Sequence, residues 1–174
     1  MKKIFIFLIF FFNINPVSAD KNIVYLDIQH IIDNSNLGKF YKTKIKINQD
    51  NNKQILQSEQ KKLKEKEQEI NNQKNILKKE ELNKQLVEFN NLVVKYKELR
   101  KELNASIVKE KKKYSTEILR ILNPLLTNYV ENNNIHLVVD KKNILVGIKS
   151  LDITTTLLDI LNKETKERKL INEN

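Results

Sequence analysis

Apolar residues recur every seven positions through the middle of the chain, among long runs of Lys, Glu, Gln and Asn. The first series is Leu56, Leu63, Ile70 and Leu77, and the positions half a heptad away are mostly polar. Two interleaved series follow: Leu82, Phe89, Tyr96 and Leu103, and Leu86, Val93, Ile107, Tyr114 and Ile121. Heptad spacing is typical of coiled coils. A sparse stripe followed by a richer one predicts a long antiparallel coiled-coil hairpin over residues 37–119, which reverses around residues 71–80.

Few helix-breaking residues interrupt this region. Gly38 and Pro124 are its only glycine and proline between residues 37 and 132, so nearly all of it is predicted to be helical. Pro124 either kinks the descending helix or begins a new one capped by Asn123. The richer stripe has three polar interruptions, which are Arg100, Glu110 and Glu117.

Short β-rich segments flank the helical region. Residues 23–28 predict one strand, a helical turn is expected at 29–32, and the long helix is expected to begin near Asn36. Beyond the helix-breaking Asn132–Asn134, residues 135–140 and 143–148 predict two more strands joined by a turn at Lys141 and Lys142. Asp152 is expected to cap a last helix. The predicted fold is mainly α with a small β body: the hairpin, or tentacle, stands on residues 20–36 and 120–174.

The predicted body is too small to bury a sizeable core within one chain. Three short strands and one helix offer few apolar positions, which favours oligomerisation. The strand positions expected to complete a body shared between chains are Ile23, Tyr25, Leu137, Val139, Ile144 and Val146.

The first residues have the pattern of a targeting signal. Lys2 and Lys3 precede an apolar run from Ile4 to Phe12, which is about half the length needed to span a bilayer. Val17, Ser18 and Ala19 then supply the small residues that a signal peptidase recognises. We therefore predict a secretory signal peptide over residues 1–19, cleaved between Ala19 and Asp20. The alternative is an uncleaved anchor at the amino terminus.

Motifs in the predicted body carry a family resemblance. The most specific are Leu137-Val138-Val139-Asp140 and Asp152-Ile153-Thr154, and they accompany the strand 23–28 and the Lys/Glu/Gln-rich hairpin. In this combination the chain resembles the Skp (OmpH) family of periplasmic chaperones. Asn132–Asn134 stands where the family pattern often has a glycine before the strand. The resemblance implies a periplasmic homotrimer with a shared β body and three tentacles, whose cavity holds unfolded outer-membrane proteins without ATP.

The composition excludes several kinds of chemistry. The chain has no Cys, which excludes disulfides, thiol nucleophiles and thiolate metal sites. Its two glycines, Gly38 and Gly147, cannot form a glycine-rich phosphate loop. His30 and His136 lie near carboxylates in sequence, but neither has a nucleophile or a second metal ligand close by. We therefore expect no catalytic residue, no metal site and no cofactor.

The chain is strongly basic, with a formal net charge of +10. The basic run Lys109–Lys113 is interpreted as a solvated helix face, with an anionic partner as the alternative. Export argues against nucleic acid as that partner. Anionic lipid or lipopolysaccharide stays open, because no motif for it can be matched residue by residue.

Client-binding residues cannot be assigned from the sequence. The aromatic residues Phe89, Tyr96 and Tyr114 lie on the heptad stripe and are expected to pack between the two arms. Phe40 and Tyr41, near the root of the first arm, are expected to pack onto the body, although they could instead line a cavity.

Three functions fit these features to different degrees. An ATP-independent holdase explains the long arms, the sparse apolar stripe and the basic charge, because many weak contacts suit many unfolded clients. The alternative is a structural coiled-coil envelope protein without client binding, which explains the terminal strands less well. An enzyme comes third, since the residue inventory leaves it little chemistry.

Overall fold

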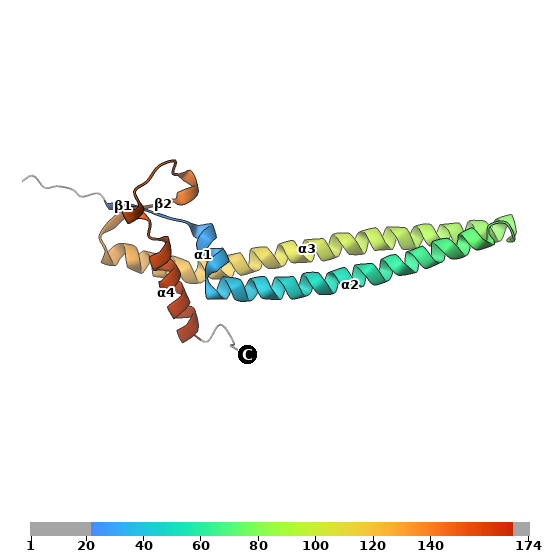
Figure 1. Cartoon of the computed structure of the whole chain (residues 1–174), viewed down its shortest axis with the longest axis horizontal. Coiled ribbons are helices and arrows are strands. Elements are labelled where there is room, and N and C mark those ends of the chain that lie inside the picture. The colour runs from blue at the N-terminus through green and yellow to red at the C-terminus, as the bar shows by residue number, and fades with distance from the viewer. Residues whose placement is uncertain (1–21, 169–174) are drawn as a thin grey trace, which may run out of the picture.

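The computed structural model describes residues 22–168 and shows a long helical hairpin on a small body (Figure 1). The hairpin consists of α2 (Asn36–Gln73) and α3 (Lys79–Asn132). The body contains β1 (Asn22–Leu26), α1 (Ile28–Asn34), β2 (Ile135–Asp140) and α4 (Thr154–Glu167), with 3₁₀ turns at Lys141–Asn143 and Lys149–Leu151. None of the helices in this described part is long and apolar enough to cross a membrane. The predicted signal peptide and its cleavage site at Ala19 and Asp20 lie outside the described residues.

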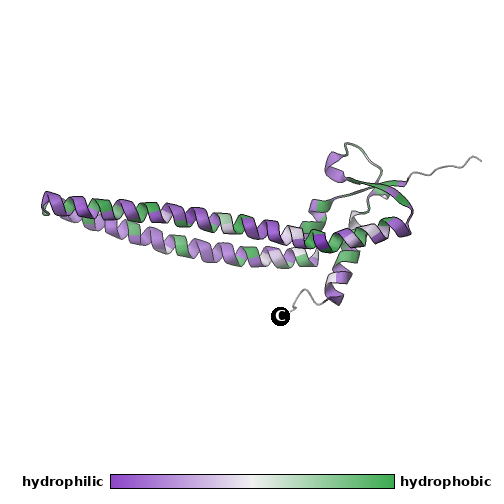
Figure 2. Ribbon diagram, turned by 180° about the vertical axis from the view of Figure 1, so that it is seen from behind, coloured by the Kyte–Doolittle hydropathy of each residue, from purple (hydrophilic) through white to green (hydrophobic). Residues whose placement is uncertain are grey.

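The antiparallel hairpin predicted from the heptads is confirmed. At 38 residues, α2 is about 57 Å long, and Figure 1 shows α3 beside it along this length. Ile70, Ile107 and Ile121 are buried, and the other stripe positions within the two helices are half-buried, except Leu86, which is 41% exposed. Figure 2 shows hydrophobic positions spaced along two largely hydrophilic helices.

The reversal lies within the predicted window and needs no glycine. After Gln73, the backbone N–H groups of Ile76 and Leu77 donate to the Gln73 carbonyl at 2.9 and 3.0 Å. These bonds tighten the end of α2, and α3 begins at Lys79. Ile76 lies at the tip and is 83% exposed.

The descending helix continues past its proline. α3 includes Pro124 and runs on to Asn132, so of the two alternatives for Pro124 the start of a new helix capped by Asn123 is wrong. Its end is marked by Asn134, the one non-glycine residue with positive φ among the described residues, at 50°. Asn tolerates this left-handed conformation better than most residues. An Asn can therefore stand where the family pattern often has a glycine.

The two ends of the body meet in a parallel pair of strands. Ile23 lies opposite Leu137 and Tyr25 opposite Val139. Parallel strands need a long crossover, and here α1 and the whole hairpin supply it. Asp152 adds one more parallel bridge to Tyr25, whose carbonyl accepts a 3.0 Å hydrogen bond from the N–H of Ile153.

The second predicted strand of the carboxyl-terminal part, residues 143–148, is absent from the described chain. A 3₁₀ turn covers Lys141–Asn143, and the following residues form an open loop in which Leu145 and Val146 are 101% and 92% exposed. The prediction was wrong for a single chain because a strand needs a neighbouring edge, and none of the residues 22–168 pairs with this segment.

The core lies where the hairpin joins the body. Its fully buried apolar side chains come from β1, α1, α4 and the roots of α2 and α3; they are Leu26, Ile31, Leu37, Ile118, Leu122, Leu157 and Leu161. Leu37 and Ile118 lie at the two ends of the predicted tentacle, so the hairpin root is part of the body's core. α4 begins at Thr154 after Ile153, and Asp152 Oδ1 accepts the Thr154 N–H at 3.0 Å. Asp152 therefore lies one residue before the N-cap position, which Ile153 occupies, and not at the N-cap as predicted.

Candidate functional site

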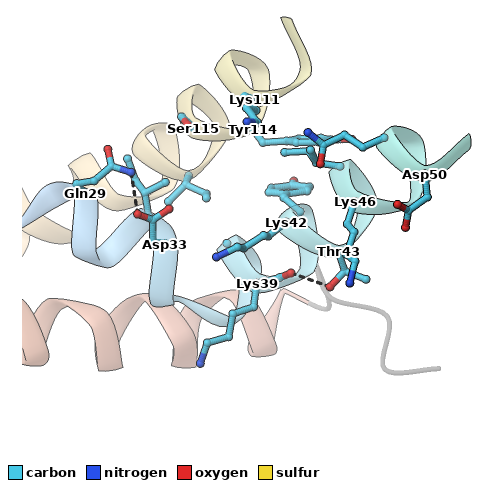
Figure 3. A pocket seen from close by; sticks show the side chains of 16 residues that line it. Gln29, Asp33, Lys39, Lys42, Thr43, Lys46, Asp50, Lys111, Tyr114 and Ser115 are labelled. Atoms are coloured by element: carbon cyan, nitrogen blue, oxygen red, sulfur yellow. Dashed lines mark hydrogen bonds between the residues drawn. The ribbon is translucent and has the colours of Figure 1, made fainter. Parts of the chain in front are cut away.

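A groove with a volume of about 860 Å³ lies at the root of the hairpin. It is bounded by α1, the first turns of α2 and the facing part of α3 (Figure 3). Its apolar and aromatic lining consists of Ile32, Ile45, Ile118, Tyr41 and Tyr114. The groove exists because Gly38 lets α2 begin close to α1: a Cβ at this position would lie 1.8 Å from the Ile32 carbonyl oxygen.

Two stacked tyrosines form one wall of the groove. The rings of Tyr41 and Tyr114 are 4.1 Å apart at their centroids and 5° from parallel. Burial, followed by the nearby Glu117 carboxylate, raises the pKa of Tyr41 to about 12. Burial and the Glu110 and Glu117 carboxylates also raise the pKa of Tyr114. Both phenols therefore keep their protons at neutral pH and can donate hydrogen bonds.

Lysines outnumber carboxylates along the groove. The lysines are Lys39, Lys42, Lys46 and Lys111, and the carboxylates are Asp33 and Asp50. Asp33 already accepts a 3.0 Å hydrogen bond from Gln29. None of the four ammonium groups forms an ion pair with another residue in the described range 22–168. The groove thus combines an apolar wall with an excess of positive charge.

A second, shallower groove continues along the hairpin. Its volume is about 690 Å³ and Gln49 lines both grooves. Leu56 and Ile107 form its apolar part, and Val108, which is 67% exposed, lies at its side. Together the two grooves follow one face of α2 and α3 away from the body.

Exposed apolar side chains occur along the whole hairpin. They are Ile47, Ile55, Ile76, Leu86, Val87, Leu92, Val94 and Val108, each at least 41% exposed. Val87, Val94 and Val108 lie at heptad spacing on α3, with Lys101 at the position between the last two. They follow a line beside the buried stripe, which is why the coiled-coil pattern did not single them out.

The residues predicted to form a shared body divide into two groups. Ile23, Leu137 and Val146 are 44%, 51% and 92% exposed, whereas Val139 and Ile144 are half-buried. Tyr25 is 8% exposed. The Tyr25 hydroxyl donates to the Ile148 carbonyl at 3.2 Å, which holds the open loop against β1. The exposed group lies on the strand pair and on this loop.

The histidines lie apart from the grooves. His30 and His136 are both exposed, and the backbone N–H of His30 donates to Asp27 at 2.8 Å as part of the α1 cap. Across the described residues, no group of three or more His, Asp or Glu side chains is placed to hold a metal ion.

Known proteins share the sequence pattern and the fold of this chain. The family model described as outer membrane protein (OmpH-like) matches residues 22–161. Among solved structures, the chain is similar to an OmpH-like protein from Caulobacter crescentus, described as a candidate outer membrane chaperone. The TM-score is 0.70 and the identity 14%, with 82% of this chain and 85% of that chain covered. At this identity the likeness shows the fold. The comparison with curated proteins found no match.

Proposed function

The chain belongs to the OmpH-like family, and we propose that it is an ATP-independent periplasmic holdase that binds unfolded outer-membrane proteins and prevents their aggregation. The observation that carries this proposal is the set of exposed apolar side chains on a hairpin about 57 Å long. Val87, Val94 and Val108 share one heptad line of α3 that Lys101 interrupts, so an unfolded chain lying along α3 can contact them one after another. A long arm that offers them to solvent is suited to an unfolded client.

The energetics favour many weak contacts over one tight site. Complete burial of a valine or leucine side chain contributes roughly 1.5–3 kcal/mol. Partial burial of Val87, Val94 or Val108 against a client contributes less, and each contact requires no particular client sequence. Several such contacts together hold a client while leaving it exchangeable, which is what a holdase without an energy source needs.

We propose that three chains assemble through the body. Ile23 lies opposite Leu137 on the strand pair, both are about half exposed, and the nearby loop 144–148 exposes Leu145 and Val146 almost fully. Pairing with a neighbouring chain would give residues 143–148 the edge that they lack in a single chain, and the three hairpins would then enclose a cavity. Light scattering of the form Asp20–Asn174 should give the mass of a trimer at micromolar concentration, and a monomer would contradict the assembly.

Export and partners complete the proposal. Cleavage between Ala19 and Asp20 would release a form whose 32 basic residues, less Lys2 and Lys3, fall to 30 against 22 acidic ones. Its partners would be copies of itself and unfolded outer-membrane proteins, with anionic lipid or lipopolysaccharide as an open further partner and no nucleic acid. Neither a cofactor nor catalysis is part of the proposed activity.

The alternative is a structural envelope protein that uses the same helices and has no client. A triple variant separates the two: Val87→Ser, Val94→Ser and Val108→Ser. A holdase should then need a several-fold higher concentration to keep an unfolded outer-membrane protein soluble. The matched control changes Asn90, Asn91 and Asn128 to Ser, at exposed positions of the same helix outside both grooves, and should behave as the parent protein. If both variants keep the client soluble equally well, the exposed valines do not contact it.

A further inference from the structure

We propose that the groove at the hairpin root is a binding subsite for extended client segments in which acidic and apolar side chains alternate. This inference rests on the proposed holdase function and assigns part of the client contact to one place on the hairpin. The exposed valines further along α3 do not discriminate between client sequences, whereas the root groove has both shape and charge.

The apolar wall supplies the first part of the recognition. Ile32 comes from α1, Ile45 from α2 and Ile118 from α3, and they meet beside the stacked rings of Tyr41 and Tyr114. The groove has a volume of about 860 Å³, which is enough for several side chains, and it is open along one side. An open groove of this kind suits a chain that passes through, rather than a small enclosed ligand.

The positive charge of the groove supplies the second part of the recognition. Lys39, Lys42, Lys46 and Lys111 have no ion-pair partner in the described residues, and only Asp33 and Asp50 oppose them along the groove. A client carboxylate entering here meets unpaired ammonium groups, and the neutral phenols of the tyrosine wall do not repel it. Glu117 lies beside Tyr41 and raises the pKa of this phenol more than Arg120 lowers it. The carboxylate-binding end of the groove is therefore at the lysines of α2 rather than at the tyrosines.

The spacing of the lysines fits an extended segment. Lys42 and Lys46 are one helical turn apart on α2, or about 6 Å along the helix axis. In an extended chain, side chains on the same face recur about every 6.6 Å. A segment that runs along α2 can therefore place a carboxylate near each lysine on one face, while its alternate residues face the apolar wall. An α-helix also repeats side chains on one face about every 6 Å, at positions four apart. A sequence that alternates acidic and apolar residues separates them onto two faces only when it is extended, because in a helix the two kinds of residue mix on every face.

Peptide binding tests the subsite directly. The chain has no Trp, so the emission of a single Trp in a peptide reports binding without background from the protein. Three peptides of equal length are compared: alternating Asp and Leu, alternating Lys and Leu, and alternating Asp and Ser. The Asp/Leu peptide should bind the full-length mature protein about tenfold more tightly than either of the others. Equal binding of the Lys/Leu peptide would overturn the proposal.

Matched variants locate the site. Lys42→Gln with Lys46→Gln should weaken binding of the Asp/Leu peptide about fivefold or more. The control, Lys64→Gln with Lys95→Gln, removes the same charge from exposed positions outside the root groove and should leave binding nearly unchanged. The same loss in both variants would mean that overall charge, and not the groove, attracts the peptide.

A second measurement does not depend on removing a lysine. The chain has no Cys, so Thr43→Cys gives a unique attachment point for a photocrosslinker in the groove, and Ser58→Cys gives one outside it. The Asp/Leu peptide should crosslink at position 43 in clear preference to position 58. Full client protection by the parent protein without this preference would reject the subsite and keep the holdase. Selective crosslinking by a protein that protects no client would reject the holdase and keep the subsite.

Discussion

Asn48 on α2 donates from its side-chain nitrogen to both carboxylate oxygens of Glu110 on α3, at 2.9 and 3.0 Å. Glu110 is one of the polar interruptions in the heptad stripe, and it is half-buried between the helices. A carboxylate in this position needs a donor from the opposite helix, since an unsatisfied buried polar group is costly. The pair therefore fixes which residue of α2 faces which residue of α3.

Asn48→Ala should destabilise the hairpin by about 1–3 kcal/mol, because Glu110 keeps its position and loses its donor. Urea unfolding followed by circular dichroism measures the change. Asn51→Ala, on an exposed position of the same helix, is the control and should alter stability little. An Asn48 variant as stable as the control would contradict the role of this pair.

Gly38→Ala should be among the most damaging single methyl additions to this chain. The new Cβ would lie 1.8 Å from the Ile32 carbonyl oxygen and 2.9 Å from Ser35 Oγ, both of which are held by helix ends. We expect a loss of at least about 2 kcal/mol in the free energy of unfolding.

Gly147→Ala is the matched control, because the nearest atom to its Cβ is at the edge of the Tyr25 ring, which can shift. Its thermal midpoint should stay close to that of the parent protein. Equal midpoints for the two alanine variants would argue against the close approach of α1 and α2.

The left-handed residue after α3 gives a conformational test. Asn134 has φ of 50°, and a β-branched side chain pays about 1–2 kcal/mol there. Asn134→Val should therefore lower the free energy of unfolding by about that amount, while Asn134→Gly should leave it unchanged or slightly higher. Thermal denaturation of the two variants checks the order, and a valine variant as stable as the glycine variant would be inconsistent with the left-handed backbone.

Acid sensitivity should depend on Asp152. Burial acts to raise the pKa of this carboxyl, but hydrogen bonds from Thr154 and from Lys141, at 2.9 Å, outweigh it and hold the pKa below its ordinary value of 3.8. A lowered folded-state pKa contributes stability that is present above the ordinary value and is lost as the pH falls through the folded one. Asp152→Asn should thus be less stable than the parent protein by about 1–2 kcal/mol at neutral pH.

The difference in stability between the parent protein and Asp152→Asn should shrink as the pH falls from about 4 to about 2. Unfolding curves at several pH values measure it. Asp159→Asn, at an exposed position of α4, is a control that should not change the acid limb of the stability profile. A constant gap between the parent protein and Asp152→Asn across this range would contradict the linkage.

The hairpin was predictable because its signal is local and repeated. Heptad spacing, the scarcity of Gly and Pro, and Asn132–Asn134 together place both helices and the reversal. The meeting of β1 with β2 also followed from the sequence, because strands at both ends of the chain needed partners. The packing of Phe40 and Tyr41 onto the body is confirmed, and Tyr41 lines the groove as well.

Features that depend on contacts between distant segments were harder to predict. Residues 143–148 have a strand-like sequence, but a strand forms only where an edge is available. The root groove needs α1, α2 and α3 together, and in sequence Lys39, Lys42 and Lys46 look like an ordinary solvated helix face. Gly38 was the available signal, since a glycine in the first turn of a long helix suggests that another backbone lies close by.

Holding of an unfolded client by the intact mature protein tests the central claim most directly. An outer-membrane barrel protein is diluted from urea into buffer without ATP, and its light scattering is followed with increasing amounts of the form Asp20–Asn174. The account predicts that scattering falls to the level of buffer when about one proposed trimer is present per client. Scattering that stays unchanged at a stoichiometric excess of the trimer would contradict the holdase and favour a structural envelope protein.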